Sequence, residues 1–136
     1  LDYESVGAAG SMLGTRALQV FDETVSVVRV VTRWAEFYQH ESCGKCTPCR
    51  EGTYWIKQIM YRLEKGQGLP GDVDLLDEIA HNIAGRSFCP LGDAAATPIT
   101  SGIKKFREEF EAGLNTAARE LFPYEASAVY ARGGVR

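Results

Sequence analysis

The sequence lacks the features that would direct it to a membrane or to nucleic acid. No apolar run approaches the roughly 18 residues of a membrane-spanning helix, since VSVVRVV is short and contains Arg29. No basic region followed by an apolar stretch stands at the start, so no signal peptide is visible. The formal net charge of −3 gives no electrostatic reason to expect a polyanionic partner. We therefore expect no nucleic-acid partner and no direct membrane insertion.

Cysteine is scarce as well. The chain has 4 cysteines in 136 residues, which is too few for a disulfide scaffold. Without a secretory signal we expect a reducing compartment, where clustered cysteines more often bind metal. The length predicts one domain that buries roughly two-thirds of its unfolded surface.

The first 23 residues differ in character from the rest of the chain. Glycines interrupt short apolar pieces, and RALQVF is typical of a strand. A single short strand is not stable alone, so we expect it to pair with a hairpin partner or outside this chain. Position 1 is Leu rather than Met, which suggests a processed piece or part of something larger.

Apolar residues then recur at helical spacing in four segments. Helices are expected over residues 24–40, from the cysteine cluster to residue 65, over residues 72–84 and over residues 97–112. The third helix is predicted to begin after Asp72 as its N-cap and to end with Gly85 at C′. The fourth is predicted to begin with Thr97 as its cap and Pro98 at N1, and to end at Gly113. Burial in a core explains the spacing of four aromatic residues: Trp34, Trp55, Phe106 and Phe110.

The predicted fold is therefore mainly α: a four-helix bundle carrying a metal cluster, preceded by a short β fragment. Its expected parts are the β segment at 1–23, the helical bundle at 24–113 and a C-terminal tail at 114–136, with a short helical piece and a loose end. In an up-down bundle, alternate loops lie at the same end. We therefore expect the loop after the first helix to meet the loop after the third.

Those two loops carry the four cysteines. Cys43, Cys46 and Cys49 form C-x2-C-x2-C, and Cys89 is followed by Pro90. Bacterial ferredoxins use the same triple spacing with a fourth cysteine before proline, because a cubane needs thiolates at separate irons. Zinc sites prefer two separated C-x2-C pairs. The partition of three plus one favours a [4Fe–4S] cluster with all four cysteines as its ligands.

The neighbouring charges agree with an anionic group at this place. Arg50 falls in the first turn of a predicted helix, where the helix dipole disfavours a cation unless an anion lies beside it. Lys45 stands inside the same loop and could act in the same way. No nucleophile–base pair or phosphate loop is present, so no catalytic residue is assigned.

Complete ligation by cysteine leaves no iron open for substrate, which favours electron transfer. Two alternatives stay open on the residues alone. One is a structural zinc module that fixes a protein–protein interface. The other is a thiol–disulfide catalyst using Cys46 and Cys49, against which the absence of a βαβ pattern counts.

Longer stretches carry a family resemblance. ESCGKCTPCREGT, followed by SFCPLGDAAATPI and KKFREEFE, resembles the C-terminal region of the NADH-oxidising flavoprotein subunit of respiratory complex I (NADH:quinone oxidoreductase). AGSMLGTRALQVFDE is similar to the end of the β-grasp segment in that family. The same cysteine pattern also resembles the flavin subunits of NAD-linked hydrogenases and formate dehydrogenases. The resemblance covers roughly residues 1–112.

The resemblance implies a place in a redox chain. In that family NADH reduces FMN, and single electrons pass to a [4Fe–4S] cluster on cysteines matching Cys43, Cys46, Cys49 and Cys89. They continue to iron–sulfur centres in neighbouring subunits, toward quinone. The resemblance also implies that residues 90–92 face the flavin. It places the protein on the cytoplasmic side of the bacterial inner membrane, or on the matrix side in mitochondria.

One part of the family pattern is missing from this sequence. The glycine-rich FMN and NADH domain lies upstream in the family, and nothing here corresponds to it. The chain alone is therefore not expected to be catalytic. It is either a C-terminal fragment, which we favour, or the partner of a separate flavin-binding chain.

Overall fold

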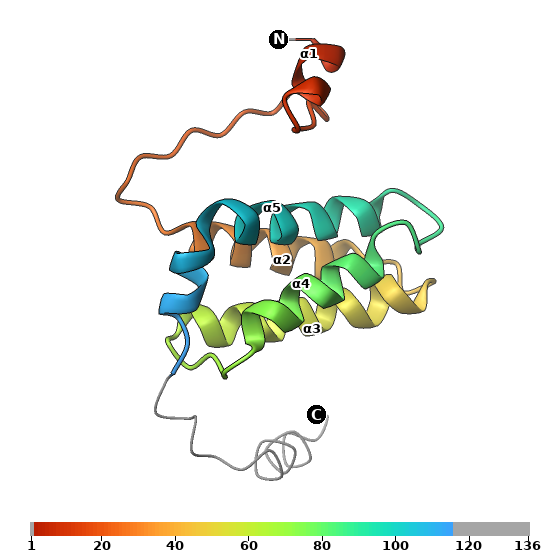
Figure 1. Cartoon of the computed structure of the whole chain (residues 1–136). Helices are drawn as coiled ribbons and strands as arrows, with labels where there is room; N and C mark the ends of the chain where they lie inside the picture. Colours follow the sequence, from red (N-terminus) through yellow and green to blue (C-terminus); the bar gives the residue numbers. More distant parts are fainter. Residues whose placement is uncertain (1, 116–136) are drawn as a thin grey trace.

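The computed structural model describes residues 2–115, and within that range the chain is mainly helical. Its helices are α1 (Tyr3–Ala8), α2 (Val27–Glu41), α3 (Thr47–Glu64), α4 (Asp72–Ile83) and α5 (Leu91–Ala112). Helices α2 to α5 each contact the next in the sequence, and α2 also contacts α5, which closes a four-helix bundle (Figure 1). The predicted helical bundle is confirmed.

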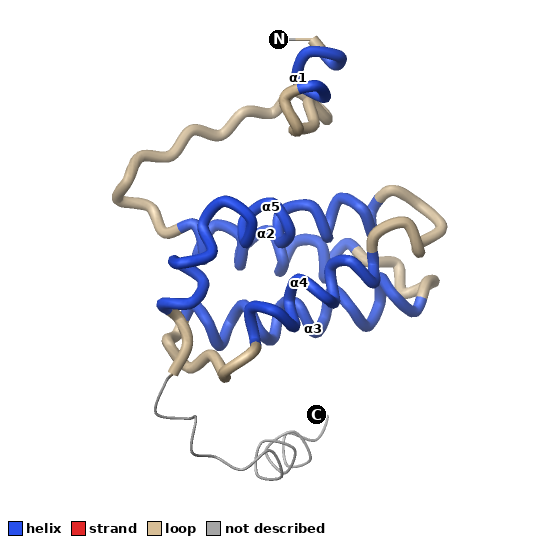
Figure 2. Tube along the Cα trace, in the orientation of Figure 1, coloured by secondary structure: helices blue, strands red, loops and turns tan. Residues whose placement is uncertain are grey.

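The predicted strand does not form within the described residues of this chain. Residues 16–22, which include RALQVF, have no regular secondary structure, and α1 precedes them (Figure 2). Within residues 2–115 the β contact is a single isolated bridge between Gly68 and Leu114. The physical reason is that a strand needs a hydrogen-bonding partner, and no second strand lies beside this segment. Residues 116–136 of the tail predicted at 114–136 lie outside the described residues.

Helix α2 is capped both by its own sequence and by a distant helix. Ser26 is its N-cap, and the Ser26 hydroxyl accepts a hydrogen bond from the Arg29 amide at 3.3 Å. Glu109 of α5 accepts from the Val27 amide at 2.6 Å and from the Ser26 hydroxyl at 2.8 Å. A carboxylate near the first amides of a helix also interacts favourably with the helix dipole. The start of α2 is therefore fixed against the far part of α5.

Helix α4 begins differently from the prediction. Its N-cap is Gly71, in the left-handed conformation at φ +91°, and Asp72 is the first helical residue rather than the cap. The Asp72 carboxylate instead accepts from the Leu69 amide at 2.8 Å and forms a 2.7 Å ion pair with Arg62. A glycine suits this entry because a side chain would disfavour positive φ. The predicted C′ glycine is confirmed, since Gly85 follows the C-cap residue with φ +70°.

Helix α5 begins earlier than predicted. It starts at Leu91, so Thr97-Pro98 lies inside the helix and the predicted start there is wrong. An internal proline costs one helical hydrogen bond and crowds the preceding turn. Ala95 and Ile99, on either side of the proline, are buried in the bundle. Their packing against the other helices offsets that cost, which local sequence signals could not indicate.

The far part of α5 changes direction. Phe106 has non-helical angles of φ −135° and ψ 32°, and the helix beyond it turns across the end of the bundle (Figure 1). The helix then ends at Ala112 with Gly113 as its C-cap, as predicted. None of the helices in residues 2–115 is long and apolar enough to cross a bilayer.

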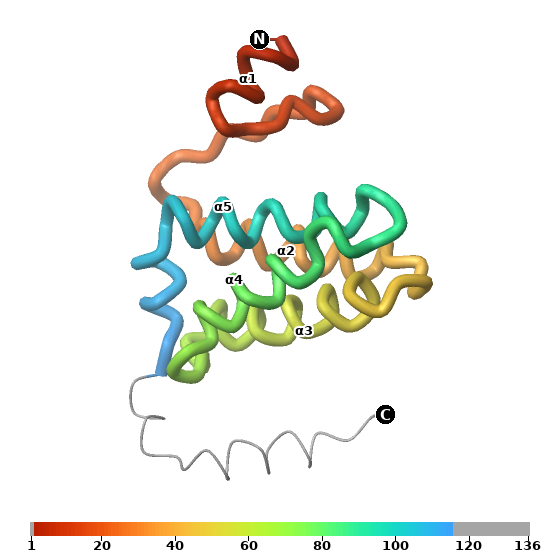
Figure 3. The backbone as a smooth tube through the Cα atoms, turned by 45° about the vertical axis from the view of Figure 1, so that its right-hand side comes forward, coloured from red at the N-terminus to blue at the C-terminus, as the bar shows by residue number. Residues whose placement is uncertain are grey.

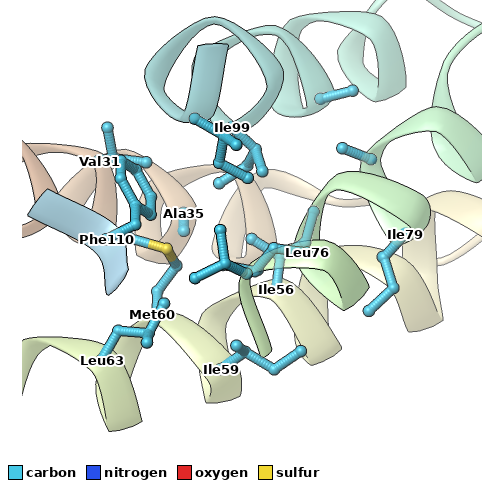
Figure 4. Packing of buried hydrophobic residues seen from close by; sticks show 14 of the residues in the cluster. Val31, Ala35, Ile56, Ile59, Met60, Leu63, Leu76, Ile79, Ile99 and Phe110 are labelled. Carbon is cyan, nitrogen blue, oxygen red and sulfur yellow. The ribbon is translucent and has the colours of Figure 1, made fainter. Parts of the chain in front are cut away.

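All four bundle helices contribute aliphatic side chains to one core (Figure 4). Phe110, at 0% exposure, is the largest fully buried side chain of this core. Trp34 is partly buried and packs against the core. Trp55 and Phe106 are 51% and 47% exposed, so their predicted burial is wrong. Trp55 lies next to the buried Ile56 and therefore points about 100° away from the core-facing side of α3.

Replacing Phe110 with alanine should destabilise the bundle strongly. Removing a fully buried aromatic ring leaves a cavity and costs about 3–5 kcal/mol. The free energy of unfolding, measured by urea titration with circular dichroism, tests this. Phe106→Ala is the matched control on the same helix, with an expected loss below about 1 kcal/mol. Equal losses in the two variants would contradict the placement of Phe110 in the core.

Replacing Glu109 with alanine should weaken the start of α2. The variant removes the acceptor for the first helical amide, and lost helix caps typically cost about 0.5–2 kcal/mol. Amide hydrogen exchange would report faster opening at Val27 and Val28. Glu108→Ala, which removes an exposed neighbouring carboxylate, is the control. Unchanged exchange in Glu109→Ala would show that this contact does not hold the helix start.

Candidate metal centre

The four cysteines meet at one end of the bundle. The loop between α2 and α3 and the loop between α4 and α5 lie side by side there (Figure 3). A cavity of about 110 Å³ lies between the two loops, and Cys43, Cys46, Cys49 and Cys89 all line it. The structure thus brings together the four residues that the sequence predicted as ligands, although 39 residues separate the last two.

Each loop cysteine has a different setting. Cys46 is the N-cap of α3, and Cys49 lies in the first helical turn and is buried. Pro48 occupies the start of the helix, where a missing N–H costs nothing. The Cys49 carbonyl accepts a 2.7 Å hydrogen bond from the Thr53 hydroxyl, as part of the same helix. The first turn of α3 therefore holds the buried thiol of Cys49 in the lining of the cavity, whereas Cys43 is exposed.

Arg50 supports the first loop rather than the thiols. Its guanidinium donates to the Gly44 carbonyl at 2.8 Å and to the Glu51 carboxylate at 2.8 Å. Gly44 itself has φ +76°, a conformation that glycine tolerates best. Lys45 is exposed and lines the cavity, so it is the cationic side chain at the thiols.

The second loop is held by the start of α5. Asp93, in the first turn of that helix, accepts a 2.6 Å hydrogen bond from the Gly85 amide. This bond ties the beginning of the loop to the helix that follows it. Cys89 lies in the loop and is exposed, two residues before Leu91, where α5 begins.

Hydrogen bonds reach two of the sulfur atoms. The Phe88 amide donates to Cys46 Sγ at 3.3 Å, so a backbone donor of the second loop contacts a thiol of the first. Ser42 Oγ lies 3.3 Å from Cys49 Sγ in a second hydrogen bond. When Cys49 is a thiolate, the hydroxyl must be the donor, because a thiolate has no proton. Such donors stabilise negative charge on sulfur.

Sequence reasoning missed Ser42 and Ser87, which also line the cavity. Each stands close to a cysteine in the chain: Ser42 directly precedes Cys43, and Ser87 lies two positions before Cys89. That closeness is the signal that could have found them. His40, by contrast, is exposed and hydrogen-bonds to Glu41 at 3.0 Å.

The donor set suits a cluster with several metal atoms. Four thiols around one cavity, two of them with hydrogen-bond partners at their sulfurs, are the soft ligands that an iron–sulfur cluster takes at its separate irons. The residues present therefore fit such a group.

A larger cavity of about 890 Å³ lies elsewhere, between residues 10–25 and helices α2 and α5. Its lining includes Phe21, Trp34, Pro98 and Phe106 and none of the cysteines. Within the described part of the chain, this apolar space is separate from the thiol cavity.

Known proteins resemble this chain closely along most of its length. The family model described as the NADH-ubiquinone oxidoreductase-F iron-sulfur binding region matches residues 29–113. In Streptomyces coelicolor, one subunit of the NADH-quinone oxidoreductase is 61% identical over 128 residues, covering 94% of this chain and 28% of that protein. Its counterpart in Mycobacterium tuberculosis strain H37Rv is 64% identical over 129 residues, covering 95% and 29%.

A mitochondrial relative and a solved structure extend the comparison. The NADH-ubiquinone oxidoreductase 51 kDa subunit of Neurospora crassa is 47% identical over 120 residues, covering 88% of this chain and 24% of that protein. A crystal structure of an NAD+-reducing [NiFe]-hydrogenase in the air-oxidized state aligns with a TM-score of 0.67 at 35% identity. That alignment covers 71% of this chain and 17% of the hydrogenase chain. The chain spans less than a third of the length of these curated relatives.

The matched region includes both cysteine segments and nearly all of the bundle. It makes up well over half of the sequence. The resemblance inferred from the cysteine motifs is confirmed, and the chain belongs to the NADH-ubiquinone oxidoreductase-F iron-sulfur binding region family.

Proposed function

We propose that this chain holds one [4Fe–4S] cluster on Cys43, Cys46, Cys49 and Cys89 and relays single electrons through it. The observation that carries the proposal is the meeting of four thiols from two distant loops at one cavity. Membership in an iron–sulfur binding family supports the same assignment.

The bound cluster would supply a site that gains and loses one electron without substrate chemistry. The chain's own residues hold and tune that site. The four cysteines provide a thiolate for each iron, so no iron is left open to a substrate. The Phe88 amide and the Ser42 hydroxyl donate to sulfur and stabilise its negative charge. Arg50 keeps the first loop in place through the Gly44 carbonyl.

The wider reaction belongs to parts outside this chain. We propose that FMN and NADH bind to an upstream domain or a partner chain, consistent with relatives more than three times as long. Electrons would then pass from reduced FMN through this cluster to iron–sulfur centres in neighbouring subunits, toward quinone. The chain is thus part of an NADH dehydrogenase (quinone) and is not catalytic alone.

The proposed domain plan and location follow from the same assignment. Residues 24–113 form the cluster-binding bundle, residues 1–23 lead in from the flavin-binding part, and residues 114–136 form the tail. Such a chain would sit in the peripheral arm of a membrane complex, on the cytoplasmic side of a bacterial inner membrane or the matrix side in mitochondria. Relatives named as subunits of quinone-reducing and ubiquinone-reducing complexes support this location.

A second assembly has support from the solved structures. The aligned structures are NAD+-reducing [NiFe]-hydrogenases, so the same relay could serve a hydrogenase. Identities of 61% and 64% to NADH-quinone oxidoreductase subunits, against 35% and 31% to the hydrogenases, favour the quinone-reducing complex. The local chemistry is the same in both assemblies.

Anaerobically prepared protein should contain about four irons and four acid-labile sulfides per chain. Dithionite reduction should give a low-temperature EPR signal of the one-electron-reduced cluster. Cys89→Ser should lose the cluster or convert it to a form with fewer irons, because one iron loses its thiolate. Its circular dichroism should keep most of the helix signal, since Cys89 lies in a loop outside the core.

Ser101→Ala is the control, because Ser101 lies on α5 outside the thiol cavity. It should keep the iron content and the spectrum of the wild type. A full four-iron cluster with an unchanged spectrum in Cys89→Ser would make the ligand assignment wrong. Zinc in place of iron in the wild type would instead establish a structural module and end the electron-transfer proposal.

A further inference from the structure

Ser87 has a polar group that nothing in the structure satisfies. Its hydroxyl oxygen is fully buried and has no hydrogen-bond partner among the described residues. It is the sole buried side-chain nitrogen or oxygen in residues 2–115 with this property. Leaving a buried hydroxyl unpaired is costly, so native proteins rarely keep one without a reason.

The surroundings of Ser87 indicate where its missing partner belongs. The residue lines the same cavity as the four cysteines. The hydroxyl also lies against the backbone of Gly92, where an added Cβ would lie 2.3 Å from Ser87 Oγ and 2.7 Å from its Cβ. Gly92 is itself buried, in the first turn of α5. A side chain at position 92 would therefore displace the hydroxyl from its place.

Two other donors at the cavity already have partners. The Ser42 hydroxyl pairs with Cys49 Sγ, and the Phe88 amide pairs with Cys46 Sγ. Both of these donors act on the protein's own thiols. Ser87 differs because its hydroxyl has no acceptor among the described residues, and a group that fills the cavity would supply one.

We propose that the Ser87 hydroxyl donates a hydrogen bond to a sulfur of the bound [4Fe–4S] cluster, and that Gly92 positions it for this contact. This assignment rests on the proposed cluster function. The reduced cluster carries one more negative charge than the oxidised cluster, so a donor at its sulfur stabilises the reduced form more. Hydrogen bonds to cluster sulfurs accordingly raise the reduction potential. Ser87 thus helps to set the potential of the relay.

The test is a redox titration of the whole cluster-loaded chain, followed by EPR, on wild type and Ser87→Ala. Removal of the donor should lower the equilibrium constant for one-electron reduction by about tenfold, which is about 59 mV toward more negative potential. Ser87→Thr keeps the hydroxyl and should restore a potential close to that of the wild type. Ser101→Ala, outside the cavity, should leave the potential unchanged.

A second readout reports the hydrogen bond itself. Wild-type protein exchanged into deuterated water should show a hyperfine coupling between a deuteron and the reduced cluster by electron–nuclear double resonance. The coupling assigned to the hydroxyl should disappear in Ser87→Ala and return in Ser87→Thr. A purely structural role for Ser87 would not remove one deuteron coupling while the iron content stays constant.

The possible failures are distinct from one another. Wild-type protein that binds no iron–sulfur cluster would overturn the proposed function and this inference with it. A wild-type potential and an unchanged deuteron spectrum in cluster-loaded Ser87→Ala would overturn the inference alone. If Ser87→Ala holds too little cluster to titrate, Gly92→Ala takes its place, because the added methyl displaces the hydroxyl without deleting it. A wild-type potential in Gly92→Ala would then overturn the assignment.

Discussion

The candidate metal centre depends on one geometric constraint. The bundle helices alternate in direction, so the loop between α2 and α3 and the loop between α4 and α5 lie at the same end. Three thiols come from one connection and the fourth from the other. The hydrogen bond from the Phe88 amide to Cys46 Sγ joins these connections directly at 3.3 Å. The core below, with Phe110 and Leu76 fully buried, sets the spacing of the helices and hence the separation of the loops.

The cysteines of the candidate metal centre differ in burial. Cys49 is buried in the first turn of α3, whereas Cys43 and Cys89 stand in loops and are exposed. The loops are nonetheless ordered by polar contacts to backbone, from Arg50 on one side and Asp93 on the other. A buried half and an open half at the surface would suit the proposed exchange of electrons with groups outside the chain.

The sequence was sufficient for features that repeat or that carry unusual chemistry. Helical spacing identified the four bundle helices, and the cysteine spacing identified the four thiols that share a cavity. It failed where packing outweighs a local signal, as at Pro98, which lies inside α5 while its neighbours pack in the core. It also missed Ser87: closeness to Cys89 in the chain could have drawn attention to this residue, but an unpaired hydroxyl is defined by what surrounds it in space.

Glu109 adds a property that concerns the opposite end of the molecule. Its carboxylate binds the first turn of α2, at the end of the bundle away from the thiols (Figure 1). Helices α2 and α5 are therefore joined at that end by a contact that does not involve the thiols. The two ends of the bundle are thus held by separate contacts between segments distant in the sequence, from Glu109 to Val27 at one end and from Phe88 to Cys46 at the other. A change confined to the thiol-bearing loops therefore leaves the contact between α2 and α5 in place.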